Sequence, residues 1–287
     1  MAGSTMTTLN DLLPTIVQEA LFVASERSIM RGLVKNYSLG PAQGKTIQVP
    51  IYPIQTAVAV TEGDEVGNTA VSTDVATFDV AQVGIRTLVT DMAINASSSN
   101  VVADLGRLFG EAIARKIDQD LIAKFSSFTT NTVGSTSTTA TPALLMQAIT
   151  KLKNGAVPSD GLVMVLHPSV AYDLKAALTT TGNVAFSGGG TSNDVANAAM
   201  MEGYLGRLFG VPVFETANFS NTGAAGDYVG GVFHRDALGL GIMRDIQIET
   251  QRRASYLGTD IVASAMYGTG VVYEGYGCAA TFDSTVL

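Results

Sequence analysis

Residues 45–90 read KTIQVPIYPIQTAVAVTEGDEVGNTAVSTDVATFDVAQVGIRTLVT, and this stretch decides the fold. Apolar side chains alternate along both of its halves, at odd positions near Ile47 and Val83 and at even positions near Val58. A period of two predicts two long strands that form a hairpin. Since a shift of one residue moves every side chain to the opposite face, we expect the base and the tip of the hairpin to pack against different surfaces. Pro53 and the step 81–82 are the candidate irregularities.

The predicted hairpin is too long to be covered by its own protein core. Fifteen residues at ~3.3 Å each give an arm of roughly 50 Å, several times the ~10 Å thickness of a packed sheet layer. An isolated two-stranded hairpin is marginal in water, so a neighbouring subunit is the economical surface for it. Its tip holds five acids and no Lys or Arg, and we interpret it either as a docking tip or as a solvated acidic loop. The acids are Glu62, Asp64, Glu65, Asp74 and Asp79.

Composition excludes several classes of protein. The 287 residues include 46% hydrophobic and 15% charged side chains, which is typical of an ordered protein with room for about two domains. The net charge of −8 argues against a sequence-independent nucleic-acid binder, because such proteins gain affinity through Lys and Arg. A single cysteine cannot form an intrachain disulfide, and no apolar run approaches the ~20 residues of a membrane span. Because surface made of Ser, Thr, Gly and Ala is unusual for a free monomer, we expect other chains to cover much of it.

Helical periodicity predicts an amphipathic helix over residues 9–31 and a long structural helix over 100–125. The second carries one apolar stripe, which runs through Val102, Leu105, Phe109, Ile113, Ile117 and Leu121. Helix and strand patterns alternate over 142–243, with a buried strand at 162–166, and the chain from Ile242 onward is mainly strand. The hexapeptide LGRLFG occurs at 105–110 and again at 205–210, but its flanks predict a helix in the first case and a turn in the second, so no repeat architecture follows.

No pattern in the sequence indicates catalysis, a metal or a cofactor. Residues 40–46 resemble a phosphate-binding loop, but one residue is missing between the glycines and a strand follows instead of a helix. His167 and His234 have no second ligand at metal-site spacing, and we interpret them as packing or turn residues. Cys278 lies in an apolar strand context typical of an inert thiol. Asp118 and Asp120 point in different directions on one helix and make no carboxylate pair.

Four local segments and their order resemble the major capsid proteins of tailed bacteriophages, the Hong Kong 97-type family. The segment 206–214, GRLFGVPVF, is similar to the family's turn-then-strand element. The segment 162–169, LVMVLHPS, followed by the helix 170–178, is similar to its strand-to-helix step. The segments 234–240 and 266–273 are similar to its C-terminal strands.

This resemblance implies an α+β fold of Hong Kong 97 type. In such a fold, residues 1–44 are the N-terminal arm and 45–92 the extended β-hairpin loop. The peripheral domain, with the long spine helix, comprises 93–140 and 244–287, and 141–243 form an α/β axial domain. The loop at Gly188, Gly189 and Gly190 is then the candidate for the centre of the capsomer, where glycine gives the backbone tolerance for rings of six and five subunits.

The function implied is that of a subunit which assembles with itself into hexamers and pentamers of an icosahedral head around double-stranded phage DNA. The head would enclose the DNA without binding it strongly, would not involve a membrane, and would be assembled in the bacterial cytoplasm as part of the virion. The resemblance also implies separate scaffolding, portal and cement or decoration proteins as partners. Because no lysine lies between Lys45 at the base of the arm and Lys116, a lysine cross-link on the extended loop is not expected.

The acids of the tip are expected to lie near basic residues of an adjacent chain. We predict that Glu62, Asp64 and Glu65, with Asp74 as a further contact, reach the vicinity of three arginines. These are Arg244, Arg252 and Arg253.

Two alternatives remain open at the level of sequence. An encapsulin-type compartment would use the same fold as a shell for a cargo enzyme, and its gene neighbours would differ from those of a phage head. A ligand-binding or enzymatic α/β domain over 142–243 would require a pocket with clustered, perturbed titratable groups.

Overall fold

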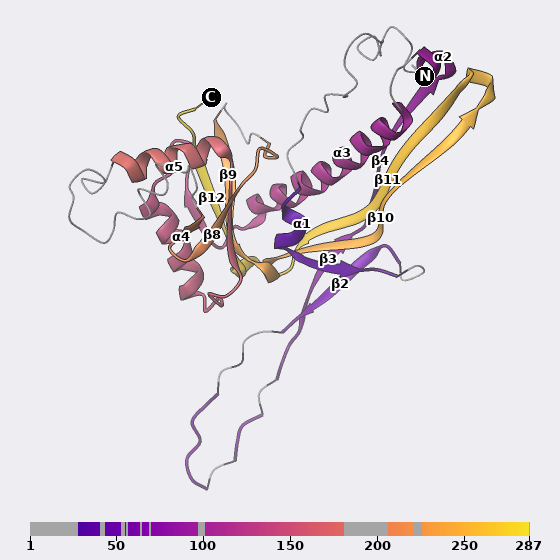
Figure 1. The fold of residues 1–287 in the computed structure, drawn as a ribbon. Helices are drawn as coiled ribbons and strands as arrows, with labels where there is room; N and C mark the ends of the chain where they lie inside the picture. Colours follow the sequence, from indigo (N-terminus) through magenta and orange to yellow (C-terminus); the bar gives the residue numbers. More distant parts are fainter. Residues whose placement is uncertain are drawn as a thin grey trace.

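A computed structural model describes residues 28–40, 44–52, 55, 57–63, 65–68, 70–96, 101–180, 206–220 and 226–286 (Figure 1). Asp64, the loop Gly188–Gly190 and residues 9–27 of the first predicted helix lie outside these ranges. The α-helices are α1 (Met30–Leu33), α2 (Asp91–Ala96), α3 (Val101–Ala123), α4 (Pro142–Asn154) and α5 (Pro168–Thr180). The strands are β1 (Lys35–Ser38), β2 (Thr46–Ile51), β3 (Asp74–Asp79), β4 (Ala81–Thr90), β5 (Thr132–Gly134), β6 (Leu162–Leu166), β7 (Arg207–Leu208), β8 (Val211–Glu215), β9 (Asp227–His234), β10 (Leu238–Arg253), β11 (Gly258–Val271) and β12 (Gly277–Asp283).

One sheet of four strands, in the order β1-β10-β11-β4, runs along the long helix α3. The strand β1 is parallel to β10, whereas β10, β11 and β4 pair antiparallel. The predicted stripe on the helix is confirmed, because its side chains at Phe109, Ile113, Ile117 and Leu121 are buried. Burial of this one face against the sheet explains why the apolar stripe of α3 follows the helical period.

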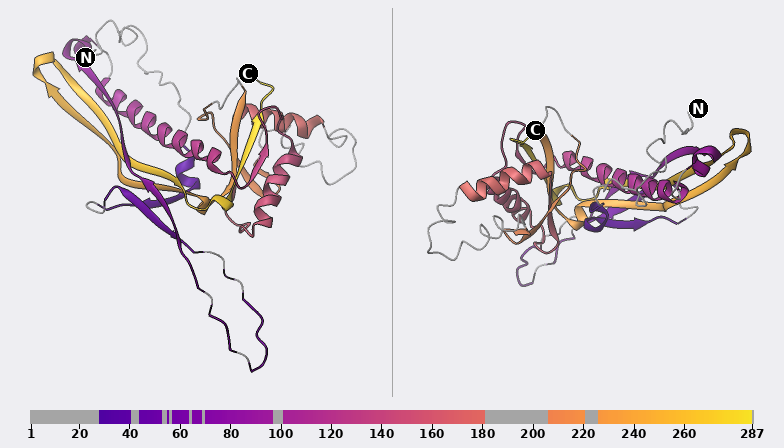
Figure 2. Two further views of the ribbon diagram at one scale, coloured as in Figure 1. Left: turned by 180° about the vertical axis from the view of Figure 1, so that it is seen from behind. Right: turned by 45° about the horizontal axis from the view of Figure 1, so that its top comes forward.

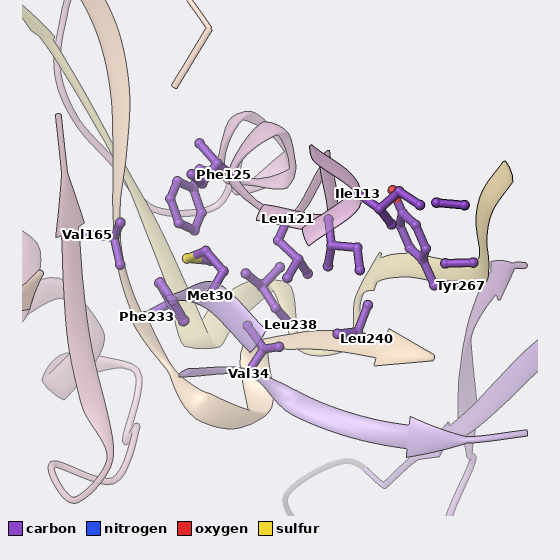
Figure 3. Packing of buried hydrophobic residues seen from close by; sticks show 14 of the residues in the cluster. Met30, Val34, Ile113, Leu121, Phe125, Val165, Phe233, Leu238, Leu240 and Tyr267 are labelled. Atoms are coloured by element: carbon purple, nitrogen blue, oxygen red, sulfur yellow. The ribbon is translucent and has the colours of Figure 1, made fainter. Parts of the chain in front are cut away.

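A second sheet of six strands, in the order β5-β12-β9-β6-β8-β7, is covered on both faces. All five residues of β6 are buried, as its unbroken apolar run predicts. Leu162, Met164 and Leu166 face the cluster that includes α4 and α5, whereas Val163 and Val165 face the cluster that includes α3. Figure 3 shows part of the latter cluster, which joins the two sheets and includes Met30, Phe125 and Leu238.

The division into axial and peripheral domains stays a prediction, but strand pairing crosses its boundaries. The strands β5 and β12 fall outside 141–243, and both join the sheet that β6, β8 and β9 form. The strand β10 runs from 238 to 253 and so passes through the boundary at 243. The two parts of the molecule therefore share strands.

The prediction of two continuous long strands over 45–90 is wrong in two places. Only β2 and β3 pair as a hairpin, with Ile47 opposite Phe78, and the described residues between Ile51 and Asp74 form no strand. The second strand also breaks at Val80, one residue before the predicted irregularity, and β4 continues in the sheet beside β11. The physical reason is that ladder hydrogen bonds need a partner strand, and β11 offers one to β4.

The predicted helix over 9–31 is also wrong at its described end. Ser28 and Ile29 are not helical, and α1 begins only at Met30. The backbone N–H groups of Ile29 and Met30 instead donate to the carboxylate of Asp118.

The second hexapeptide makes a turn, as expected. Gly206 and Gly210 have positive φ angles of 46° and 83°, and Phe209 has one of 52°, so the described part of this copy cannot be helical.

Candidate assembly surface: the extended arm and its socket

The most conspicuous surface feature is the extended arm, which we define as β2, β3 and the described residues between them. It projects from the body of the molecule, as the views in Figures 1 and 2 show. Apolar side chains along it face solvent: Val58 is 80% exposed and Val66 is 72% exposed. Exposed apolar side chains on an unpaired, extended chain are typical of a segment that binds another surface.

The base of the arm, in contrast, is packed against four glycines that we call the glycine socket. Gly239 lies opposite Gly270 and Gly241 opposite Gly268 in the β10–β11 ladder, and together they form a strip without side chains. A Cβ atom on Gly241 would overlap Cδ1 of Ile47. The ring of Phe78 lies over Gly239 and Gly270. A Cβ atom added to Gly270 would lie 2.6 Å from this ring, and one added to Gly239 would lie 3.0 Å from it. Glycine is therefore required here because the arm approaches the backbone of the sheet directly.

Neighbouring contacts fix the same end of the arm. Ile47 and Phe78 are 6% and 5% exposed and form a small apolar cluster with Val272. The rings of Tyr37 and Phe78 are 6.0 Å apart at an interplanar angle of 56°. The N–H of Val80 donates to the carbonyl of Lys45 at 2.8 Å, which closes the base of the hairpin.

The acids predicted to dock are distributed along the arm. Glu62 and Glu65 are exposed in its distal part, where residues between Lys45 and Arg86 include no positive charge. Asp74 lies at the start of β3, and its Oδ1 accepts from the N–H of Val75 at 2.8 Å. The structure therefore brings Glu62 and Glu65 into one exposed region and places Asp74 nearer the body.

The three arginines predicted to receive these acids lie on β10, and each has a partner within the chain. Arg252 pairs with Asp91 at the start of α2, and the Nη2–Oδ2 distance is 2.7 Å. Arg253 lies with Nε 2.6 Å from Oδ2 of Asp260, and Arg244 donates to the hydroxyl of Ser264. The pairing between chains stays a prediction.

The acidic partners Asp91 and Asp260 were missed by the sequence reasoning. Asp260 is 2% exposed and lies between Arg253 and Arg86, whose Nη2 is 2.9 Å from its carboxylate. The hydrogen bond from Arg252 holds the pKa of Asp91 below its usual value. Knowledge of the strand register would have located Asp260. In the ladder, Asp260 of β11 lies opposite Leu88 of β4 and opposite Gln251 of β10.

Asp118 and Asp120 separate as predicted, and Asp118 has a role that the sequence did not indicate. Asp118 is buried and accepts from the hydroxyl of Ser28 at 2.7 Å and from the N–H of Ile29 at 2.8 Å. Burial raises the pKa of the Asp118 carboxyl, and these hydrogen bonds oppose the shift. Asp120 instead accepts from Lys116 and from the hydroxyl of Tyr267, whose pKa burial raises.

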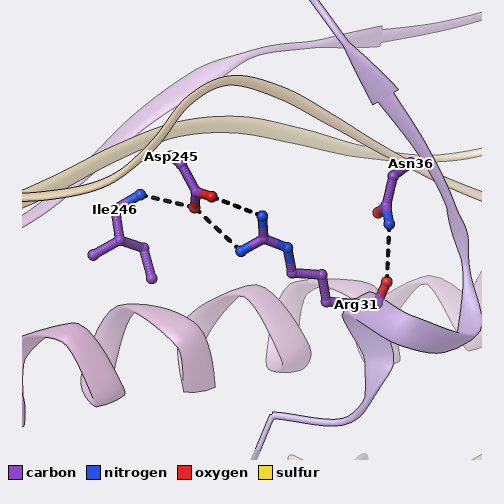
Figure 4. Close-up of polar contacts among 4 residues, drawn as sticks. All are labelled: Arg31, Asn36, Asp245 and Ile246. Atoms are coloured by element: carbon purple, nitrogen blue, oxygen red, sulfur yellow. Dashed lines mark hydrogen bonds and ion pairs between the residues drawn. The ribbon is translucent and has the colours of Figure 1, made fainter.

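A second contact ties the chain after Ser28 to the sheet (Figure 4). Both terminal nitrogens of Arg31 donate to Asp245 on β10, at 2.8 and 3.2 Å. The N–H of Ile246 also donates to Asp245, and the amide of Asn36 donates to the carbonyl of Arg31. The N-terminal end of the described chain is thus fixed to α3 by Asp118 and to β10 by Arg31.

Both histidines and the single cysteine make packing or hydrogen-bond contacts within the fold. His167 stacks on Tyr228 with ring centroids 3.6 Å apart, its Nδ1 accepts from the N–H of Ser169, and burial lowers its pKa. The Nδ1 of His234 accepts from the N–H of Asp236. Cys278 is buried, and burial raises its pKa to about 11. These contacts agree with the interpretation of the two histidines as packing or turn residues and of Cys278 as an inert thiol.

Within the residues that the structure describes, no group of three His, Cys, Asp or Glu side chains is placed to hold a metal ion. No helix in the same ranges is long and apolar enough to span a membrane.

Comparison with known proteins identifies the family. The family described as phage capsid protein matches residues 74–281, which is most of the chain. No curated protein matches the sequence.

Solved structures from phages share the fold. The capsid structure of the cyanophage P-SCSP1u has a TM-score of 0.73 and 19% identity and covers 99% of this chain and 97% of its own. The mature capsid of bacteriophage PhiM1 has a TM-score of 0.69 and 16% identity, covering 96% and 91%. The capsid of the Helicobacter pylori bacteriophage KHP30 has a TM-score of 0.70 and 10% identity, covering 99% and 98%.

The mixed fold of helices and strands therefore matches phage capsid structures over nearly its full length, and these comparisons do not favour the compartment-shell and α/β-enzyme alternatives. The chain belongs to the phage capsid protein family and is a major capsid protein that forms the head.

Proposed function

We propose that the chain assembles into hexameric and pentameric capsomers of an icosahedral head around double-stranded DNA, with the extended arm lying on an adjacent subunit. The observation that carries this proposal is the contrast along the arm, where Phe78 is 5% exposed and Val58 is 80% exposed. A free subunit would leave the distal valines in water, whereas an adjacent subunit would bury them.

Opposite charges on the tip of the arm and on β10 also support the proposed contact. In the assembled shell Glu62, Asp64 and Glu65 lie near Arg252 and its neighbours of an adjacent chain, with Asp74, Arg244 and Arg253 at the edge of the contact. The side chain of Arg252 is 54% exposed although it pairs with Asp91, so a second carboxylate can approach it from outside. Complementary charge of this kind orients the partners during association more than it adds to affinity.

The remaining parts of the head follow from the resemblance. The loop Gly188–Gly190 lies at the centre of each capsomer, and 141–243 form the axial domain around it. Separate scaffolding, portal and cement or decoration proteins complete the particle in the bacterial cytoplasm, and the DNA is enclosed without strong binding. The net charge of −8 supports the last point, because a wall of like charge does not adhere to DNA. The shell role requires no enzymatic activity.

Negative-stain microscopy and light scattering of the purified protein test the proposal. Capsomers or closed shells are the expected result, and a monomer at all concentrations and salt conditions would overturn it.

The charged contact is tested by the variant Glu62→Gln/Asp64→Asn/Glu65→Gln. Assembly should weaken most at low salt, where screening is least. The matched control Asp104→Asn/Glu249→Gln/Asp283→Asn removes the same charge from the body of the subunit and should assemble like the unmodified chain. Equal assembly of both variants would reject the role of the tip acids.

A further inference from the structure

The outward face of α3 carries a stripe of residues that no described element covers. Leu108, Ala112, Arg115 and Gln119 follow one another at intervals of four, three and four residues, so they lie on one side of the helix. The sheet packs on another side, through Phe109 and its stripe, as Figures 1 and 2 show for α3 and β10–β11. Leu108 is 41% exposed, and Ala112 and Arg115 are exposed as well.

The stripe ends at a cleft of about 150 Å³ beside the last turn of α3. Ile122 and Ala123 of the helix line it on one side, and Phe219 and Val229 line it on the other. The face therefore offers apolar contacts at both ends, with the cation of Arg115 between them.

The described chain begins at this helix. Ser28, Ile29 and Met30 all donate to Asp118, which directly precedes Gln119 of the stripe and lies one turn before Ile122. The described chain therefore begins within one helical turn of the uncovered face. This anchor favours the preceding segment over a separate protein as the occupant, because docking the segment costs no loss of overall translational freedom.

The sequence of that segment matches the face. Residues 9–27 carry an apolar stripe at helical spacing, made of Leu13, Ile16, Val17, Ala20, Leu21 and Ala24. As a helix of ~1.5 Å per residue the segment reaches roughly 28 Å, more than the roughly 17 Å from Leu108 to Gln119.

We propose that residues 9–27 form an amphipathic helix that packs on the outward face of α3 of the same chain, with Asp118 as the anchor at its end. The unassembled subunit would then already carry this helix in place. This contact lies within a single subunit and does not depend on how subunits contact one another.

Hydrogen exchange of the full-length chain, kept dilute and unassembled, tests the proposal on peptides that cover residues 9–27. In the unmodified chain exchange should be slowed at least about tenfold relative to an unstructured peptide, and in Leu108→Glu it should return to within about twofold of that reference. Leu21→Glu, on the opposing side of the contact, should have the same effect. The matched control Met146→Glu places the same charge on an exposed position of α4, where Met146 is 52% exposed, and should keep the protection.

Three results would overturn the proposal. The first is exchange of residues 9–27 at unstructured rates in the unmodified chain. The second is protection that survives both Leu108→Glu and Leu21→Glu. The third is protection that develops only at concentrations where subunits associate, since the face would then be covered by a neighbour. An unchanged unfolding midpoint of each variant shows that the body of the subunit has kept its fold.

Discussion

The base and the distal part of the extended arm differ in burial: apolar side chains are buried at the base and exposed in the distal part. At the base, Ile47 and Phe78 lie against a glycine strip that admits no Cβ atom, and the contact is complete within one chain. In the distal part, Val58, Val66 and the acids around them face solvent. The subunit itself therefore fixes where the arm starts, whereas the proposed resting surface of the distal part belongs to an adjacent subunit. Substitutions at the two ends should therefore separate folding from assembly.

The largest expected effect is that of Phe78→Ala at the base. Removing a buried aromatic ring from a contact with the socket should lower the free energy of unfolding by about 3–5 kcal/mol, because the cavity cannot collapse onto a rigid sheet. Denaturant unfolding of the unassembled subunit measures this loss. A decrease below about 1 kcal/mol would mean that the base is not held by the socket, and the contrast between the two ends would fail.

Gly241→Ala should have the next largest effect. The new Cβ atom overlaps Ile47, so overpacking should cost about 1–3 kcal/mol in the same unfolding experiment. The control Gly275→Ala adds a Cβ atom where none of the neighbouring atoms lies within 4 Å. The double variant Gly241→Ala/Ile47→Val should recover part of the loss; strict additivity of the two changes would contradict the socket.

The contact of Asp118 with Ser28, Ile29 and Met30 is, like the base of the arm, complete within one chain. Its contribution to the free energy of unfolding should depend on pH. Because burial raises the pKa of Asp118 above the ordinary 3.8, the folded state binds the proton more tightly than the unfolded state does. The contribution of this group to stability therefore falls as the pH rises from 3.8 through the raised value, and grows again on acidification.

Comparison of the unmodified chain with Asp118→Asn measures this slope by unfolding at a series of pH values. The advantage of the unmodified chain should increase as the pH is lowered through that window. A constant difference between the two proteins over the window would show that the folded and unfolded pKa values are equal.

The smallest effect on the subunit should come from Val66→Ser in the distal arm. Val66 is 72% exposed, so the free energy of unfolding should change by less than about 0.5 kcal/mol. Light scattering should nevertheless show weaker assembly, because the proposed contact buries this valine on an adjacent subunit. If Val66→Ser lowered the stability of the subunit but left assembly unchanged, the distal part would serve folding and not assembly, which contradicts the proposal.

Local patterns predicted many of the elements because their cause is local. The stripe from Phe109 to Leu121 follows the helical period and so identified α3, and the unbroken apolar run at 162–166 identified a strand buried on both faces. The predicted alternation of helix and strand begins at residue 142, and Pro142 is the first residue of α4, where the hydroxyl of Thr141 accepts from the N–H of Leu144. The apolar residues change from even positions at Phe78 and Val80 to odd positions at Val83, and this change marked the region where β3 ends and β4 begins.

Contacts between distant segments were decided by the tertiary structure. No local pattern singles out the four glycines of the socket, and only the β10–β11 register sets them in opposing pairs beneath Ile47 and Phe78. The pairing of Arg252 with Asp91 and the capture of Ser28 by Asp118 join residues 161 and 90 positions apart. The proposed docking of the acids on arginines of a neighbour cannot be read from one chain, because it depends on the placement of a second one.

The sequence by itself determined that this protein has a long helix, an overlong acidic arm and a buried α/β part, because amphipathic periods depend only on which side chains follow one another. The tertiary structure alone decided that β4 leaves the hairpin for the sheet of β11, that β5 and β12 complete the sheet of β6, and that the arm stands on a strip of glycine. The physical reason is that strand register and close backbone approach are set by pairings across many residues, and those leave no period in the sequence.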